Sequence, residues 1–385
     1  MYLNHIRSRL FKALEQIQYG QISIAGPDGN TYAFSGVEPG PDVKVELEDW
    51  RVLVNLATKG QIGMTEEYRD ARIRTDNLVG LIELGLINDK CLQPYLSGGF
   101  FARCLAQLSY LFNANTIRGS RRNIHAHYDL GNEFYKLWLD PSMTYSSAIF
   151  ADGEDLQSAQ NTKYDRILEH LGQSSGSIIE LGCGWGGFAE RALAAGDFEI
   201  KGITLSKEQS RYARDRLGDA ATIAVEDYRA QRGKYQNLVS IEMFEAVGER
   251  YWPNYFRKVK DLLDARGRAL IQTIVIGEQW FGRYRRGSDM IRTFIFPGGM
   301  LPSAERFSYE AKKAGLRVDD SFRFGTDYAK TLEHWQSNFE SALPNVRALG
   351  FDDRFIRVWK FYLAACIAGF RQGRTDVMQV ELTHA

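Results

Sequence analysis

The chain has 385 residues, of which 44% are hydrophobic and 25% are charged, a composition typical of a globular protein with one large and one small domain. Lysine plus arginine and aspartate plus glutamate both number 48, so the zero formal net charge excludes a long-range attraction to nucleic acid. The sequence shows neither a signal peptide, nor a run of ~18 apolar residues for a spanning helix, nor a metal-ligand spacing among its four cysteines. We therefore expect a cytoplasmic protein without a metal, whose membrane contact, if any, is peripheral.

Residues 1–92 alternate short apolar runs with turn signals, which is typical of a small accessory α+β domain. The glycine- and proline-containing stretches mark the places where the chain turns between strands. The expected elements are strands at 21–24, 32–34 and 43–47, a tight turn at 26–30, a loop at 38–42 and a helix at 50–58.

Residues 93–122 form a linker with an apolar and aromatic stretch that ends in the basic residues Arg118, Arg121 and Arg122. Two interpretations remain open. The segment is either a linker helix packed against a core, or an interfacial helix whose basic edge binds anionic lipid headgroups.

From residue 123 to 385 the pattern changes to α/β, which predicts a Rossmann-like catalytic domain. Short buried strands alternate with helices, and this order implies a parallel sheet with helices on both faces. The ligand of such a sheet binds at the carboxyl ends of the strands. The expected strands are 177–181, 199–204, 221–225, 237–241 and 269–274, and the expected helices are 188–195 and 207–217.

The strongest local motif is the glycine-rich turn at residues 180–187. Gly182, Gly184 and Gly186 allow the backbone to turn sharply and to approach a ligand closely. The acidic Glu180 precedes them, where it would hold the cationic amino group of a bound methionine moiety. This combination predicts a site for S-adenosyl-L-methionine (SAM).

The same turn also satisfies the pattern GxGxxG through Gly187, so a dinucleotide site is the alternative. Two features count against it. A pyrophosphate would be repelled by Glu180, and the second strand ends at residues 204–206 without the acidic residue that binds a ribose.

With these motifs in order, the catalytic region resembles the cyclopropane-fatty-acyl-phospholipid synthase (mycolic acid cyclopropane synthase) family. The resemblance implies the fold of a class I SAM-dependent methyltransferase, and the first hundred residues resemble the accessory domain of many bacterial members. The motifs that carry it are 127–132, 143–148, 180–187, 204–209, 243–245, 295–302, 324–328 and 361–363 with Cys366.

The resemblance implies a set of residues around SAM. Two would close over it, the glycines would line its methionine portion, two would contact the ribose and three would surround the adenine. An alternative for Tyr228 and Arg229 is that they are surface residues after a strand. With Glu180, the full set is Tyr145, Ser146, Gly182, Gly184, Gly186, Thr204, Gln209, Asp227, Tyr228 and Arg229.

The implied reaction transfers the methyl carbon of SAM to the cis double bond of an unsaturated acyl chain in a membrane phospholipid. A carbocation forms and loses a proton as a cyclopropane ring closes, which requires a dry apolar pocket and a base. Alternatives are a methylene- or methyl-branched product, a C-methyltransferase for another apolar alkene, and a lipid-binding protein that has lost its activity.

In the family the base is a bound bicarbonate. The resemblance implies that the carboxyl group of Glu245, the hydroxyl group of Tyr328 and the backbone N–H of Ile274 hold it. Two positions depart from the family pattern, because Ser147 replaces the usual cysteine and Gln272 the usual histidine. A glutamine can donate a hydrogen bond but cannot carry a proton, so we expect weaker bicarbonate binding.

Cys366 matches a cysteine often described as catalytic in the family, although the chemistry needs no thiol and a buried helical cysteine explains it equally well. The resemblance also implies a location at the inner face of the membrane and leaves a homodimer open.

Overall fold

The structure, a computed structural model, describes residues 2–96 and 130–385. The two interpretations of the segment 93–122 therefore fall largely outside the described residues. The described part forms two compact units, each built from separate stretches of chain. The first unit comprises residues up to 96 with 283–297 and 343–373, and the second comprises 130–282 with 298–342 and 374–385. The linear domain boundaries at residues 92 and 122 stay a prediction.

The first unit contains a four-stranded sheet in the order β2-β1-β3-β4. Strand β1 pairs antiparallel with β2, as the predicted turn requires, and parallel with β3. Apolar side chains from the sheet and its helices form one core. The elements are α1 (Tyr2–Leu14), β1 (Tyr19–Ala25), β2 (Thr31–Ser35), β3 (Glu38–Leu47), α2 (Val52–Lys59), α3 (Gln61–Arg69), β4 (Ile73–Thr75), α4 (Leu78–Ile87) and α5 (Asp89–Leu96).

The loop predicted at residues 38–42 is wrong, because β3 begins at Glu38 and includes Pro39 and Pro41. Strand β4 pairs with β3 only from Val45 to Leu47, so in the described part of the chain residues 38–42 have no strand paired on that side. A proline, which has no N–H to donate, is tolerated where a strand lies at a sheet edge or beside a bulge. The pairing of β3 with β1 shifts register between Tyr19 and Gln21, which is such an irregularity.

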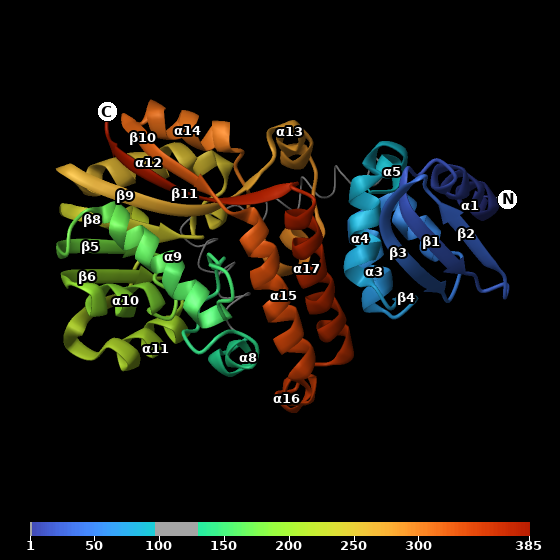
Figure 1. The fold of residues 1–385 in the computed structure, drawn as a ribbon, viewed down its shortest axis with the longest axis horizontal. Coiled ribbons are helices and arrows are strands. Elements are labelled where there is room, and N and C mark those ends of the chain that lie inside the picture. Colours follow the sequence, from blue (N-terminus) through green and yellow to red (C-terminus); the bar gives the residue numbers. More distant parts are fainter. Residues whose placement is uncertain (1, 97–129) are drawn as a thin grey trace. The chain divides into compact units, whose positions relative to one another are not determined.

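The C-terminal part of the first unit is helical and packs on the N-terminal helices. It contains η5 (Ile291–Ile295), α16 (Leu343–Ala348) and α17 (Asp353–Arg371). Helix α17 packs against α3 and α4 (Figure 1). The ring of Phe361 lies 5.8 Å from that of Tyr68, and Arg354 pairs with Asp70 at 2.8 Å.

The second unit is built on a seven-stranded sheet in the order β10-β11-β9-β8-β5-β6-β7 (Figure 1). All five strands predicted from the sequence are present and pair parallel with their neighbours. Two further strands, which the sequence did not predict, join the sheet at one edge by antiparallel pairing. The strands are β5 (Ser175–Leu181), β6 (Asp197–Thr204), β7 (Ala221–Val225), β8 (Tyr235–Ile241), β9 (Leu263–Ile276), β10 (Leu316–Arg323) and β11 (Thr375–His384).

Helices cover both faces of this sheet, since consecutive residues of β5 and β8 are buried. Helix α10 packs with α9, and α12 packs with α14. This arrangement is the class I SAM-dependent methyltransferase fold. The helices are α8 (Asn132–Lys136), α9 (Leu156–Leu171), α10 (Gly187–Ala195), α11 (Lys207–Leu217), α12 (Trp252–Leu262), α13 (Glu278–Arg286), α14 (Ala304–Lys313) and α15 (Gly325–Ser341).

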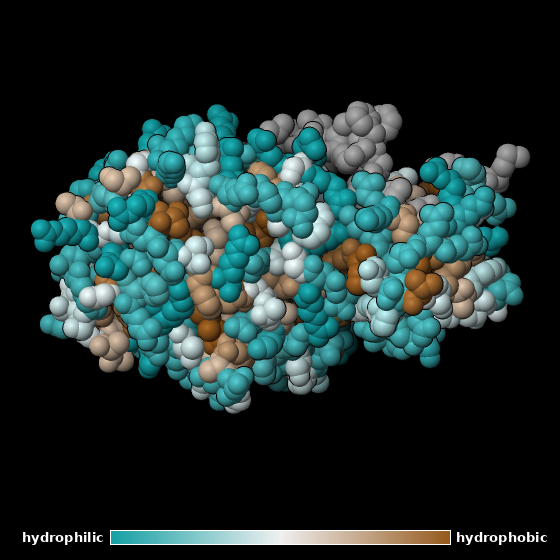
Figure 2. Space-filling model, turned by 45° about the horizontal axis from the view of Figure 1, so that its top comes forward, coloured by the Kyte–Doolittle hydropathy of each residue, from teal (hydrophilic) through white to brown (hydrophobic). Residues whose placement is uncertain are grey.

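The visible surface is mostly hydrophilic, with hydrophobic residues in small separate areas (Figure 2). Among residues 2–96 and 130–385, no helix is both long and apolar enough to cross a membrane.

Candidate active site

Four neighbouring parallel strands, in the order β8-β5-β6-β7, end at the same edge of the second unit's sheet. The residues predicted for SAM, except Tyr145 and Ser146, end or follow three of these strands, and the acidic segment 242–245 follows β8. Carboxyl ends of parallel strands meet at one edge, so the topology gathers these segments there. Every predicted site residue except Cys366 lies in the second unit.

The glycine-rich turn has the backbone conformation that its glycines predict. Gly182, Gly184 and Gly186 have φ of 84°, 53° and 86°, in the left-handed region that side chains disfavour. The backbone N–H groups of Gly182 and Cys183 both donate to the carbonyl of Ile203 on the adjacent strand. A Cβ added at Gly184 would meet no atom within 4 Å, so this part of the turn faces open space.

Glu180 is the second-to-last residue of β5, just before this turn. Its side chain is only 2% exposed, and its Oε2 atom has no hydrogen-bond partner. Burial raises the pKa of Glu180 to about 8. A buried carboxyl oxygen without a partner is costly unless a ligand supplies a donor. The ammonium group of SAM would be such a donor, and the open space at Gly184 fits a ligand beside it.

The residues predicted for the nucleoside follow β6 and β7. The hydroxyl group of Thr204 donates to Gln209 Oε1 at 2.8 Å, so these two side chains support each other. Asp227 is 7% exposed and accepts from Arg229 Nε and Nη2, at 2.8 and 2.6 Å. Tyr228 packs its ring 5.6 Å from Tyr255. Their predicted roles around the ribose and the adenine stay predictions.

The two residues predicted to close over SAM lie in the segment before α9. Tyr145 sits in an aromatic cluster, with its ring 5.2 Å from that of Trp335. Ser146 accepts a hydrogen bond at 2.7 Å from Lys163, which is fully buried. Burial lowers the pKa of Lys163 to about 7. The sequence analysis missed Lys163, and a lysine within an amphipathic helix gives no signal of such burial.

Glu242, which was not predicted from the sequence, lies among three of the residues predicted to bind bicarbonate. Glu242 Oε1 accepts from the backbone N–H of Ser147 and from Gln272 Nε2, both at 2.8 Å. Glu242 Oε2 accepts from the hydroxyl group of Tyr328 at 2.6 Å. An acidic residue directly after a central strand, three positions before Glu245, is the signal that could have found it.

Glu245 occupies a neighbouring position with other donors. Its Oε1 accepts from the backbone N–H of Ile274 and, at 3.0 Å, from Thr273 Oγ1, whereas its Oε2 is buried without a partner. Burial, followed by the negative charge of Glu242, raises the pKa of Glu245 to about 8. Glu245 is therefore protonated at neutral pH, as two nearby carboxyl groups with different surroundings often are.

The predicted bicarbonate does not fit these residues well. The donors expected from Ser147, Gln272 and Tyr328 already bind the carboxylate of Glu242, and the donor expected from Ile274 binds Glu245. A second anion would displace a carboxylate and be repelled by it.

Cys366 lies on α17, in the first unit. Burial raises the pKa of its thiol well above the usual value, so the thiolate is disfavoured.

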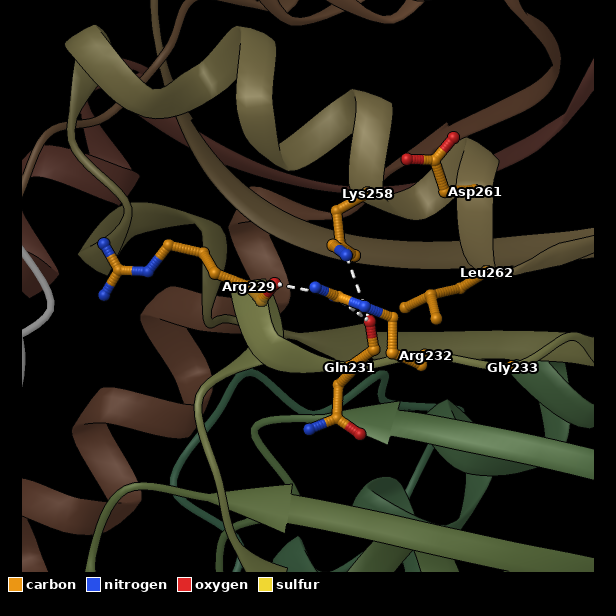
Figure 3. A pocket seen from close by; sticks show the side chains of 7 residues that line it. All are labelled: Arg229, Gln231, Arg232, Gly233, Lys258, Asp261 and Leu262. Carbon is orange, nitrogen blue, oxygen red and sulfur yellow. Dashed lines mark hydrogen bonds between the residues drawn. The ribbon is translucent and has the colours of Figure 1, made fainter.

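A hollow of about 380 Å³ lies beside α12 and the segment that follows β7. Of the residues predicted for SAM, only Arg229 lines it. Figure 3 shows Arg232 and Lys258 directed at backbone oxygens there and Arg229 extending away from them, so the cations already have partners.

Known proteins resemble this chain along most of its length. A family model described as mycolic acid cyclopropane synthetase matches residues 116–380. The cyclopropane-fatty-acyl-phospholipid synthase of Escherichia coli (strain K12) is 31% identical over 381 residues, which cover 93% of this chain and 94% of that protein. The tuberculostearic acid methyltransferase UfaA1 of Mycobacterium tuberculosis is 40% identical over 275 residues, 68% of this chain and 64% of that protein.

Solved structures agree with the sequence comparisons. The mycolic acid cyclopropane synthase CmaA1, solved as a complex with SAH and CTAB, is 31% identical and superposes with a TM-score of 0.64, covering 68% of this chain and 97% of that one. The family model spans more than half of the chain, and the predicted fold and SAM motif are present. The chain therefore belongs to the mycolic acid cyclopropane synthetase family and is a SAM-dependent methyltransferase.

Proposed function

We propose that this methyltransferase adds the methyl carbon of SAM to the cis double bond of an unsaturated acyl chain in a membrane phospholipid, and that the product is a cyclopropane ring. SAM supplies an electrophilic methyl group on a positively charged sulfur. The π electrons of the alkene form the new carbon–carbon bond, and the cation left on the acyl chain loses a proton. Bicarbonate as the base stays a prediction, and the contacts of Glu242 count against it.

The observation that carries this proposal is the pair of half-buried carboxyl groups next to the SAM turn. Glu242 and Glu245 are half-buried, the Oε2 atom of Glu245 is shielded from solvent, and their neighbours Ser147 and Gln272 are 0% and 1% exposed. A dry site protects a carbocation from water, and a buried carboxylate stabilises positive charge on the acyl chain. A methyltransferase for a soluble amine needs neither feature.

A phospholipid substrate is favoured by the comparison with the E. coli enzyme, which extends over 93% of this chain, first unit included. The double bond of a phospholipid lies inside the bilayer, so the enzyme must work at the membrane surface. We therefore infer peripheral contact with the inner face of the membrane. A homodimer remains a prediction.

A branched product is the second candidate, because UfaA1, 40% identical, is named a tuberculostearic acid methyltransferase. The same cation gives a methylene branch if a hydride shifts to the neighbouring carbon before the proton is lost. The proposed substrate class is unchanged by this alternative.

The test is an incubation of the full chain with SAM labelled in its methyl group and with vesicles of an unsaturated phospholipid. Label is expected in the fatty acids released by saponification, and gas chromatography with mass spectrometry distinguishes a ring from a branch. Vesicles of a fully saturated phospholipid are the control. Equal labelling of both vesicle types, or label only on a soluble acceptor, would contradict the proposal.

A further inference from the structure

Glu242 has a backbone conformation that a glutamate adopts only under constraint. Its φ is +48°, one of three positive values among the described non-glycine residues. Such a conformation is strained in a residue with a side chain and is found mostly at functional sites. The backbone N–H of Glu242 donates to the carbonyl of Gln272 at 2.8 Å, which ties the residue to β9. The fold therefore holds this side chain in one direction at the end of β8.

The surroundings of Glu242 match those of a base rather than those of a structural ion pair. It accepts three hydrogen bonds, from Ser147, Gln272 and Tyr328, and these favour its ionised form. A carboxylate has about four lone-pair sites, so one remains for a proton. Within residues 2–96 and 130–385, no basic side chain hydrogen-bonds to Glu242, and the positive charge of the buried Lys163 acts on it only through space.

A chain of buried amides fixes which atom of Gln272 faces Glu242. Gln379 Nε2 donates to Gln272 Oε1 at 3.0 Å, and Arg166 Nη1 donates to Gln379 Oε1 at 2.9 Å. Since the oxygen of Gln272 is occupied by this contact, its Nε2 is left to donate to Glu242. Gln272 is thus a fixed donor to a carboxylate, a role that needs no cationic histidine.

Glu242 also lies close to the SAM turn. The next residue, Met243, brings its side chain to within 2.9 Å of the Cβ position that Gly182 lacks. Strands β8 and β5 are paired up to Val239 and Glu180, just before these two segments. Any methyl donor bound on the glycine turn therefore lies beside the segment that carries Glu242.

We propose that Glu242 is the base of the reaction and takes the place that bicarbonate was predicted to fill. This inference rests on the proposed function. After methyl transfer, a C–H bond of the new methyl group breaks, and its electron pair closes the ring onto the cationic carbon. The proton passes to a carboxylate oxygen of Glu242, and after product release it passes to water. The protonated Glu245 adds no second negative charge beside it.

The test uses the labelled SAM and vesicle assay in buffer freed of carbon dioxide, with and without added bicarbonate. Added bicarbonate is expected to change the wild-type rate less than about twofold. The rate of Glu242→Gln is expected to be about 100-fold or more below the wild-type rate, the usual range for a lost general base. Glu245→Gln replaces a neutral acid by a neutral amide and should lose much less. Glu310→Gln, a buried carboxyl group outside the site, should retain the wild-type rate.

Melting temperature and SAM affinity, measured for each variant, separate a lost base from a lost fold. Glu242→Gly removes the carboxylate and frees its three donors, and glycine suits the positive φ. Added formate or bicarbonate should therefore raise the rate of this variant at least tenfold. A wild-type enzyme that depends on bicarbonate, or a Glu242→Gln variant with normal turnover, would overturn the assignment. So would a Glu242→Gly variant that binds SAM normally and is rescued by neither anion. Wild-type enzyme that labels no acyl chain would instead refute the proposed function on which the assignment rests.

Discussion

At the scale of single residues, buried charge explains how the site recognises a cation. Glu180 is buried, Glu242 and Glu245 are half-buried at the same edge of the sheet, and burial raises the pKa of each. Glu180, with a pKa of about 8, is mostly neutral before a ligand binds and becomes ionised when a positive ligand arrives. The positively charged sulfur and ammonium groups of SAM supply that charge, whereas the pyrophosphate of a dinucleotide would be repelled.

Glu180→Gln is expected to weaken SAM binding about 10- to 100-fold, because a charged hydrogen bond contributes about 1.5–3 kcal/mol. Wild-type binding should also release protons at pH 7, since Glu180 with a pKa of about 8 is mostly protonated before the ligand arrives. Isothermal titration calorimetry in buffers of different ionisation enthalpy measures both effects. Equal affinity and equal proton release in the two proteins would remove Glu180 from the site.

At the scale of elements, the glycine turn can be tested with a matched pair of substitutions. Gly184 and Gly218 have nearly equal φ, 53° and 54°, and neither would bring a Cβ within 4 Å of another atom. Alanine should therefore strain the backbone at both positions, and at Gly218, whose ψ is −136°, by more than the ~1–2 kcal/mol of a left-handed helical residue. Only Gly184→Ala should lose SAM affinity as well, by tenfold or more, because its Cβ would enter the ligand's space. Equal affinity of the two variants for SAM would contradict this geometry.

The amide chain that joins β11 to β9 makes Gln379 a positioning residue. Gln379→Met removes the donor that holds Gln272, and it should cost about 1–3 kcal/mol of stability because buried partners are left unpaired. Glu242 would lose a donor to its ionised form, so its pKa would rise further and the pH–rate profile would move to higher pH. Lower thermal stability with an unchanged profile would show that Gln379 is only structural.

The sequence predicted the elements around the SAM turn well, because their signals are local. Glycines at 182, 184 and 186 and the alternation of strands and helices are visible within a few residues. Strands β10 and β11 were missed because their sequences, LRVDDSFR and TDVMQVELTH, mix apolar residues with many polar and charged ones and so lack an apolar run. Glu242 was missed because its three donors come from positions 147, 272 and 328. These donors come together around Glu242 only when the chain folds.

At the scale of the whole molecule, the buried carboxyl groups predict how stability depends on pH. The folded pKa of Glu180 and of Glu245 is about 8, above the usual 4.5, so the folded state binds more protons than the unfolded state between these values. Their contribution to stability is therefore complete at acidic pH and is lost as pH rises to about 8. Lys163 opposes this above about pH 7, because its lowered pKa favours the folded state in alkali.

Melting temperature measured against pH, without SAM, checks this expectation. Each carboxyl group contributes to the slope of melting temperature against pH between about pH 5 and pH 7. This contribution should disappear in Glu180→Gln and in Glu245→Gln, respectively. Saturating SAM should flatten the wild-type slope, because a bound cation lowers the pKa of Glu180. Substitutions that leave the slope unchanged would show that other groups dominate it.

The most direct test of the account follows the fate of the transferred methyl group. The full chain is incubated with SAM carrying three deuterium atoms on that group and with vesicles of an unsaturated phospholipid, and the acyl chains are then analysed by mass spectrometry. The account predicts modified chains that retain two of the three deuterium atoms, because one leaves as the ring closes. Chains that retain all three, or chains without any added carbon, would contradict it.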